Sequence, residues 1–243
     1  MKKMIALALA ACAAAQVVAA VPARGGKRAA ANAAPAAAAK EAEDERLSIE
    51  QFPTIGRQAT LAAPNVPGTS NIRGKCATNQ RRWIVLEAKY QTMAKWHDRL
   101  TFTWHVLLDS KTATENKNNK DGLPPYSYFT TSTTYANIPR GRHAASVCLH
   151  PSYYERFGEP AAVGLVITND KGEVLAGDCE SQVKGIESHP KSVEEAFWNK
   201  SDIMEAKVGN TDDPMIERRE GLLDRSKTIW ALVNPDDYEL VAQ

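Results

Sequence analysis

The side chains best suited to chemistry in this sequence are its histidines, serines and cysteines, and their spacing matches no catalytic or metal-binding pattern. No two histidines share a helical turn, and no carboxylate cluster accompanies them. No Gly-x-Ser-x-Gly sequence is present to hold a serine nucleophile. We therefore expect no catalytic residue, no metal site and no cofactor, and a protein that is not an enzyme. The histidines, which we expect to be solvated or hydrogen-bonded, are His97, His105, His143, His150 and His189.

Aromatic residues near the predicted loop ends offer a binding site rather than a catalytic one. Rings of this kind stack on sugars or on partner proteins when they are exposed. The alternative is that they close the ends of the core, which we expect for Tyr90, Trp104 and Tyr135. The residues of the candidate platform are Trp96, Tyr126, Tyr128, Tyr153 and Tyr154.

The N-terminus has the pattern of an export signal. Residues 1–23 contain two lysines, an apolar stretch and then small residues suited to cleavage after Ala20 or Ala23. The sequence from Leu9 to Cys12 also matches the motif before a lipid-modified cysteine, so lipidation at Cys12 and outer-membrane anchoring is an alternative to simple cleavage; an uncleaved anchor is a third. Each outcome places the chain in the periplasm or at the cell surface.

Export permits disulfides, and the three cysteines after the signal allow at most one internal bridge. If the strands around the turn at 169–172 pair, Ala162 lies opposite about Cys179. If the strand ending near residue 149 lies on the other side, Ala162 also neighbours Cys148. A bridge between Cys148 and Cys179 then requires one strand to cross to a facing sheet. The alternative is that both, with Cys76, stay reduced and buried.

Composition along the chain divides it into four parts. Residues 24–46 are alanine-rich and then charged, with no apolar face, and predict a tether. Residues 47–80 contain several prolines and predict extended chain along a domain edge. We expect the folded domain to comprise residues 81–243, with a C-terminal extension.

Alternating apolar and polar residues predict several strands in this domain. Residues 83–90 and 100–108 alternate, and the short connector between them predicts an antiparallel hairpin. Strands are also predicted over 127–137 and 143–149, with a chain reversal at 138–141. A second hairpin is predicted from 161–168 and 173–178, and the C-terminal region adds a short helix over 193–200 and a strand over 228–233. This pattern predicts a mainly β fold, an antiparallel immunoglobulin-like β-sandwich with a short C-terminal helix.

The overall composition is that of a soluble globular protein. The chain has 243 residues, of which 43% are hydrophobic and 24% charged, and its formal net charge is +1. These values exclude wholesale disorder, and the lack of a basic excess argues against nucleic-acid binding.

Three segments resemble a family of exported verrucomicrobial proteins with an immunoglobulin-like sandwich, encoded beside type IV pilus machinery. They are the run from Trp83 to Asp98 before LTFTWHVLL, TYANIPRGRH leading to VCLHP, and LLDRSKTIWALV followed by DDYELV. The resemblance covers residues 81–240 and implies a periplasmic or surface protein associated with pili.

The N-terminus lacks the glycine, glutamate and long apolar helix of a prepilin. The resemblance therefore implies an accessory component rather than a major pilin, with pilus-system or other envelope proteins as partners and self-association as a further option. Open edge strands offer one route to such partners. The alternative function is a carbohydrate-binding or adhesive module that recognises mucosal glycans.

Overall fold

The computed structural model describes residues 47–56, 59–62, 82–110, 124–228 and 239–240. The predicted signal at 1–23, the lipidation site Cys12, the tether at 24–46 and Cys76 lie outside these residues. So do residues 229–233 of the strand predicted over 228–233. The described part starts in a strand, β1 (Leu47–Gln51), so the sheet begins well before residue 81.

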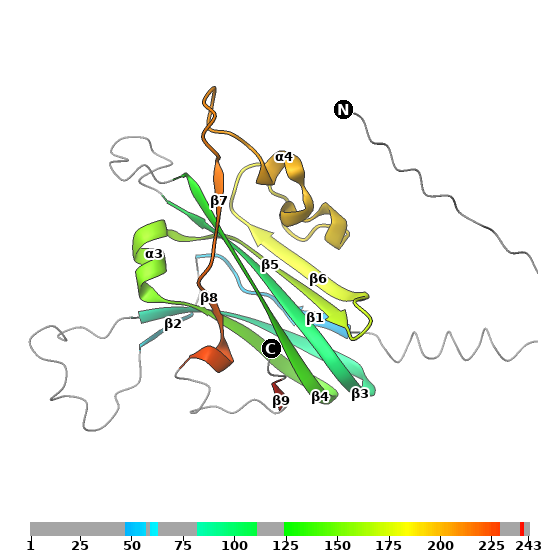
Figure 1. The fold of residues 1–243 in the computed structure, drawn as a ribbon. Coiled ribbons are helices and arrows are strands. Elements are labelled where there is room, and N and C mark those ends of the chain that lie inside the picture. The colour runs from blue at the N-terminus through cyan, green and yellow to red at the C-terminus, as the bar shows by residue number, and fades with distance from the viewer. Residues whose placement is uncertain (1–46, 57–58, 63–81, 111–123, 229–238, 241–243) are drawn as a thin grey trace, which may run out of the picture. The chain divides into compact units, whose positions relative to one another are not determined.

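The centre of the fold is a ribbon of two long antiparallel strands, β3 (Arg82–Asp109) and β4 (Tyr126–Leu149). They pair from end to end, with one irregularity near Thr92, and Figure 1 shows them running side by side and bending together. The predicted hairpin between 83–90 and 100–108, and the predicted reversal at 138–141, are therefore wrong. Both segments bend without reversing because each continues to pair with the other strand across the bend.

Each half of the ribbon carries further strands on its outer edges. On the half with the start of β3 and the end of β4 these are β1, β2 (Ala59–Ala62) and β8 (Leu222–Asp224). On the other half they are β5 (Glu159–Asn169), β6 (Val174–Ser181) and β7 (Ile216–Arg219), while β9 (Glu239–Leu240) pairs near the middle of β4. Only the β4–β7 pairing is parallel among the described strands.

The main core lies between the two halves of the ribbon. The predicted inward faces are confirmed: alternate residues of both halves of β3 are buried and belong to one apolar cluster with β4 and β5. The members from β3 are Ile84, Leu86, Ala88, Tyr90, Leu100, Phe102, Trp104, Val106 and Leu108. Two halves of a sheet that share one core form a sandwich. The predicted class, a mainly β antiparallel sandwich, is thus confirmed.

The predicted hairpin from 161–168 and 173–178 is also confirmed, as β5 and β6. Its turn is closed by the side-chain oxygen of Asn169, which accepts hydrogen bonds from the backbone N–H groups of Lys171 and Glu173. An asparagine that bonds to the backbone two residues ahead is a strong turn former.

The predicted helix over 193–200 is wrong in detail. The chain there forms two short 3₁₀ turns, η2 (Val193–Glu195) and η3 (Phe197–Asn199), followed by α4 (Ser201–Met204). Ala196 is extended between the turns, and the Ser192 side chain makes no capping bond.

These short elements cover the outer face of the β5–β6 half and form a second, smaller core. Its members are Leu107, Tyr128, Ala162, Cys179, Phe197, Met204 and Ile216. At the C-terminal end of β4 the chain forms α3 (Pro151–Phe157), and η4 (Arg225–Lys227) follows β8. Among the described residues, no helix has the length and apolar character needed to cross a membrane.

Candidate functional site

The structure does not bring the five residues of the predicted aromatic platform together. Trp96 lies at the bend of the ribbon and is 56% exposed. Tyr128 and Tyr126 pair with Leu107 and Asp109, which follow Trp96 by 11 and 13 residues, so both lie near the far end of β3 at about 35–45 Å along extended chain. Tyr153 and Tyr154 lie on α3 and pack against the main core.

Tyr128 is part of a buried stack rather than an exposed surface. Its hydroxyl lies 2.5 Å from Nδ1 of His105, and the His105 ring stacks on Trp198 with ring centroids 4.3 Å apart and an interplanar angle of 4°. His105 lies on the face of β3 that points away from the main core, and Trp198 covers that face. Burial lowers the pKa of His105 to about 4, so the ring is neutral at physiological pH. The buried stack of Tyr128, His105 and Trp198 therefore has a structural role.

Trp198 fits there because β5 has a glycine beneath it. Gly164 lies opposite His105 in the sheet. A Cβ atom at Gly164 would lie 1.9 Å from Cζ3 of Trp198, well inside van der Waals contact. The ring therefore occupies the space that any larger residue would fill.

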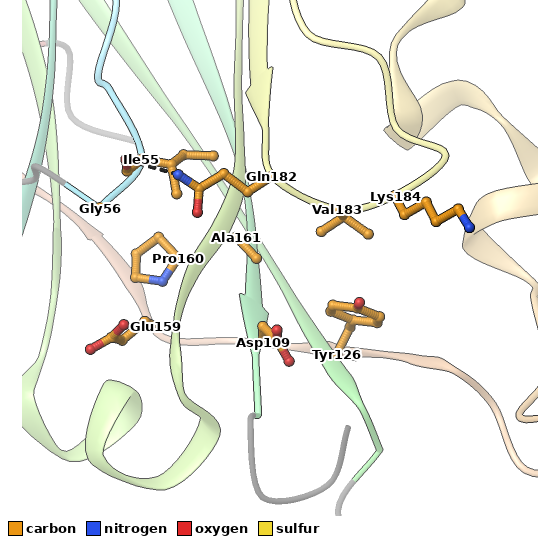
Figure 2. Close-up of a pocket in the computed structure, with 10 residues that line it drawn as sticks. All are labelled: Ile55, Gly56, Asp109, Tyr126, Glu159, Pro160, Ala161, Gln182, Val183 and Lys184. Atoms are coloured by element: carbon orange, nitrogen blue, oxygen red, sulfur yellow. Dashed lines mark hydrogen bonds between the residues drawn. The ribbon is translucent and has the colours of Figure 1, made fainter. Parts of the chain in front are cut away.

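A pocket of about 220 Å³ lies at the end of the sheet where several strand ends converge (Figure 2). It is lined by the turn after β1, the end of β3, the starts of β4 and β5, and the segment that follows β6. Asp109 pairs with Tyr126 on one side and with Glu159 on the other, so one sheet row supplies three of its polar residues. Gly158 makes this row possible, because a Cβ there, at φ 96°, would lie 1.8 Å from the backbone oxygen of Asp109.

Hydrogen-bond acceptors and one tyrosine ring dominate the pocket's polar lining. Figure 2 shows Asp109 beside Tyr126, with Glu159 and Lys184 extending to opposite sides. The amide nitrogen of Gln182 donates one N–H to the backbone oxygen of Ile55, at 3.1 Å, and its second N–H and its amide oxygen are its other hydrogen-bonding groups. Burial, and then the Asp109 carboxylate, raise the pKa of Tyr126. Such a lining suits a small ligand that carries several hydroxyl donors.

Of the predicted platform residues, only Tyr126 lines this pocket. Sequence reasoning missed the others because Ile55, Gln182 and Lys184 come from segments with no recognisable motif. The available signal was an acidic residue just after one predicted strand, Asp109, and another just before a later one, Glu159, but that signal requires the β3–β5 pairing to be known.

The predicted disulfide between Cys148 and Cys179 is not formed, and both thiols are free and buried. Cys179 on β6 shares a sheet row with Gly164, His105 and Thr130, whereas Cys148 lies at the far end of β4, on the other half of the ribbon, where it pairs with Val85 and Leu223. Cys148 alternates with Val147 and Leu149 of the main core, and Cys179 belongs to the second core, so the main core separates the two thiols. Packed sheets lie about 10 Å apart, which is beyond the reach of a disulfide. The prediction assumed that β4 lies beside β5, whereas β3 occupies that place. Burial raises the pKa of Cys148 to about 11 and that of Cys179 to about 12, so neither is a reactive thiolate.

The histidines are dispersed in the described part of the chain, where no group of three or more His, Cys, Asp or Glu side chains is placed to hold a metal ion. The Nε2–H of His143 donates to the Pro139 carbonyl oxygen at 2.8 Å, and the His143 ring lies against Tyr90. His150 caps α3 by accepting from the backbone N–H of Ser152, and His189 pairs with Asp178 at 2.9 Å.

The fold and this geometry define the chain as a mainly β sandwich protein with a small polar pocket at one end of its sheet. A protein-family model matches residues 47–243, well over half of the sequence, and the chain belongs to that family. No curated protein gives a significant match.

A solved crystal structure of a protein from Akkermansia muciniphila has a similar fold, with a TM-score of 0.54 and 19% sequence identity. The similarity covers 82% of this chain and 94% of that one. At this level of identity the likeness concerns the fold alone.

Proposed function

We propose that this chain is a non-enzymatic, exported cell-envelope protein that serves as an accessory component of a type IV pilus-like system. The observation that supports the proposal most directly is the set of three sequence segments quoted above, which resemble exported proteins encoded with pilus machinery. The predicted export signal and a sandwich fold shared with a protein from Akkermansia muciniphila are consistent with it.

The placement of the ionisable groups supports a binding role over a catalytic one. The groups whose pKa values burial perturbs most are His105, Cys148 and Cys179. In active sites, such groups border a cleft. Here they do not line the pocket and are packed between the sheet and neighbouring elements, which is typical of structural residues.

Strand addition is closed off along part of the edge strand β6. The Cys179 backbone N–H donates to the Asp178 side chain, and its carbonyl accepts from the N–H of His189. The Ser188 hydroxyl bonds to both the N–H and the carbonyl of Ser181. Local groups thus occupy the positions that an added strand would use. We infer that partners dock on other surfaces of this half.

The test is recovery of partners from cells. The full chain with a C-terminal affinity tag is expressed in its native host, envelope proteins are cross-linked, and the co-purified proteins are identified. We expect pilus-system proteins to be enriched over a control with an unrelated exported protein that carries the same tag. Retention of the chain in the cytoplasm, or an envelope location without pilus proteins among its cross-links, would contradict the proposal.

A second candidate function, glycan binding, is favoured by the pocket. A tyrosine ring beside several acceptors is the arrangement with which proteins hold sugar rings, by stacking and by hydrogen bonds to hydroxyls. We expect Tyr126→Ala to abolish binding of mucin-derived monosaccharides in a calorimetric titration. Trp96→Ala, which alters an aromatic residue far from the pocket, is the matched control and should leave it unchanged. Equal effects of the two substitutions, or no binding by the wild type, would exclude this site.

A further inference from the structure

The bend of the β3–β4 ribbon displays an exposed tryptophan. Between the pairs Thr92–Gly141 and Trp96–Pro139, β3 contains three residues and β4 only one, Arg140. The extra residues form a bulge, which bends the ribbon and turns side chains outward. Among the described residues, only Trp96 and Val174 are large hydrophobic side chains exposed by more than half.

Hydrogen bonds within the bulge hold this bend in place. The Thr92 hydroxyl donates to the Pro139 carbonyl at 2.8 Å and accepts from the Gly141 N–H at 3.0 Å. Ile138, on the opposite strand, is fully buried. Trp96 therefore lies on a hydrogen-bonded strand element. Its exposure leaves in water apolar surface whose burial in a core would stabilise the fold.

Basic residues lie close to this tryptophan along the ribbon. Lys95, Arg99 and Arg140 are exposed at the bend together with Asp98, and Glu239 of β9 lies in the sheet row of Ala136 and Arg99. The local balance is three positive charges against two negative, while the whole chain carries 30 basic and 29 acidic residues. Arg142 is left out of this count because it pairs with Glu50 at 3.0 Å. We call Lys95, Trp96, Arg99 and Arg140 the bend surface.

The N-terminal chain joins the fold at the same place. Leu47, the first residue of β1, pairs with Thr92 at the bulge. Residues 24–46, which the sequence predicts as a tether, separate this point from the predicted signal or lipid anchor, and 23 residues of extended chain span at most about 80 Å. Any membrane attachment through that segment would therefore reach the folded domain beside the bend surface.

We propose that the bend surface binds an anionic lipid membrane, with Trp96 at the level of the headgroups and the three basic side chains against the lipid phosphates. Tryptophan prefers this interface because one part of its ring system is apolar and its N–H is polar. Each lysine or arginine near an anionic surface strengthens binding about fivefold. The proposal deepens the proposed envelope function, on which it rests for the presence of a membrane.

The experiment uses the full chain and vesicles of phosphatidylglycerol and phosphatidylcholine, with phosphatidylcholine alone as the neutral comparison. Binding is measured by co-sedimentation, and the depth of Trp96 by quenching of tryptophan emission with brominated acyl chains. The variants are Trp96→Phe and the triple change Lys95→Gln, Arg99→Gln and Arg140→Gln. Two controls match them: Trp83→Phe, and Lys171→Gln with Lys191→Gln and Lys207→Gln, which removes three exposed charges elsewhere.

We expect the wild type to prefer the anionic vesicles and to be quenched by brominated lipid. Trp96→Phe should lose most of that quenching, and the triple change at the bend should weaken binding by tenfold or more, while both controls behave as wild type. The N-terminal segment is common to all variants, so the differences report on the bend surface alone.

Three results would overturn the proposal: quenching that is unchanged in Trp96→Phe, equal effects of the two triple changes, or binding to acidic polysaccharide but not to vesicles. Recovery of pilus proteins from a chain that fails these vesicle tests would leave the proposed function standing and remove only this inference. Vesicle binding by a chain that stays in the cytoplasm of the native host would support the bend surface and contradict the proposed function.

Discussion

Replacing Gly164 by alanine tests whether the stack of Trp198 on His105 fixes the outer elements on the sheet. The added Cβ would lie 1.9 Å from the indole ring, and the ring would have to leave its place. The backbone itself presents no obstacle, because Gly164 is not among the residues with positive φ. Overpacking of a well-packed site costs about 1–3 kcal/mol, and loss of an aromatic pair a further 0.5–1.5 kcal/mol or so.

We therefore expect Gly164→Ala to lower the free energy of unfolding by about 2–4 kcal/mol, which moves the urea midpoint down by about 1–2 M at an ordinary m-value. The matched measurement is the same substitution in a Trp198→Ala background, where the new methyl group meets no ring and should cost close to nothing. A double-mutant cycle gives the coupling energy between the two positions. An equal cost in both backgrounds would refute the steric argument.

Three further predictions concern buried groups. Burial lowers the pKa of His105 to about 4, so below about pH 6.5 the unfolded chain takes up a proton that the folded chain does not. The free energy of unfolding should therefore fall by up to roughly 3 kcal/mol from pH 6.5 to pH 4. Urea titrations at both pH values should show a smaller fall for His105→Gln than for the wild type. Cys148 and Cys179 should resist iodoacetamide at neutral pH until the chain is unfolded, and rapid labelling in the native state, read by mass spectrometry, would contradict their burial. Thr92→Val should cost about 1–3 kcal/mol in urea unfolding, because it leaves two backbone groups at the bulge without their partner, whereas Thr92→Ser should retain nearly full stability.

The faces of the strands could be predicted from the sequence because alternation depends only on the local pleat. Leu100, Phe102 and Trp104 are buried as expected, and the turn after Asn169 was recognisable from its own residues. The pairing of the strands could not be predicted in this way. A bend inside a continuous strand and a short hairpin connector look alike in sequence, since both interrupt the alternation for a few residues.

One error in pairing had several consequences. The hairpin predicted from 83–90 and 100–108 places the strand at 143–149 beside the strand at 161–168, so that Cys148 and Cys179 share a level. In the structure β3 lies beside β5, which places Asp109 beside Glu159, and the end of β4 that holds Cys148 lies on the other half of the ribbon from Cys179. The pocket was missed for the same reason, because its acidic row exists only in the true strand order. The Trp198 stack was missed because the predicted helix gave no reason for Trp198 to meet β3.

The continuous ribbon also separates the two candidate binding surfaces. Trp96 and Tyr126 lie at opposite ends of one half of the ribbon, about 40 Å apart along extended chain. Substitutions that far apart, with no shared contacts, have additive effects. A Trp96→Phe, Tyr126→Ala double variant should therefore lose lipid quenching and glycan binding to the same extent as the two single variants. Coupling between them would mean that the second half of β3 transmits a change from the bulge to the pocket.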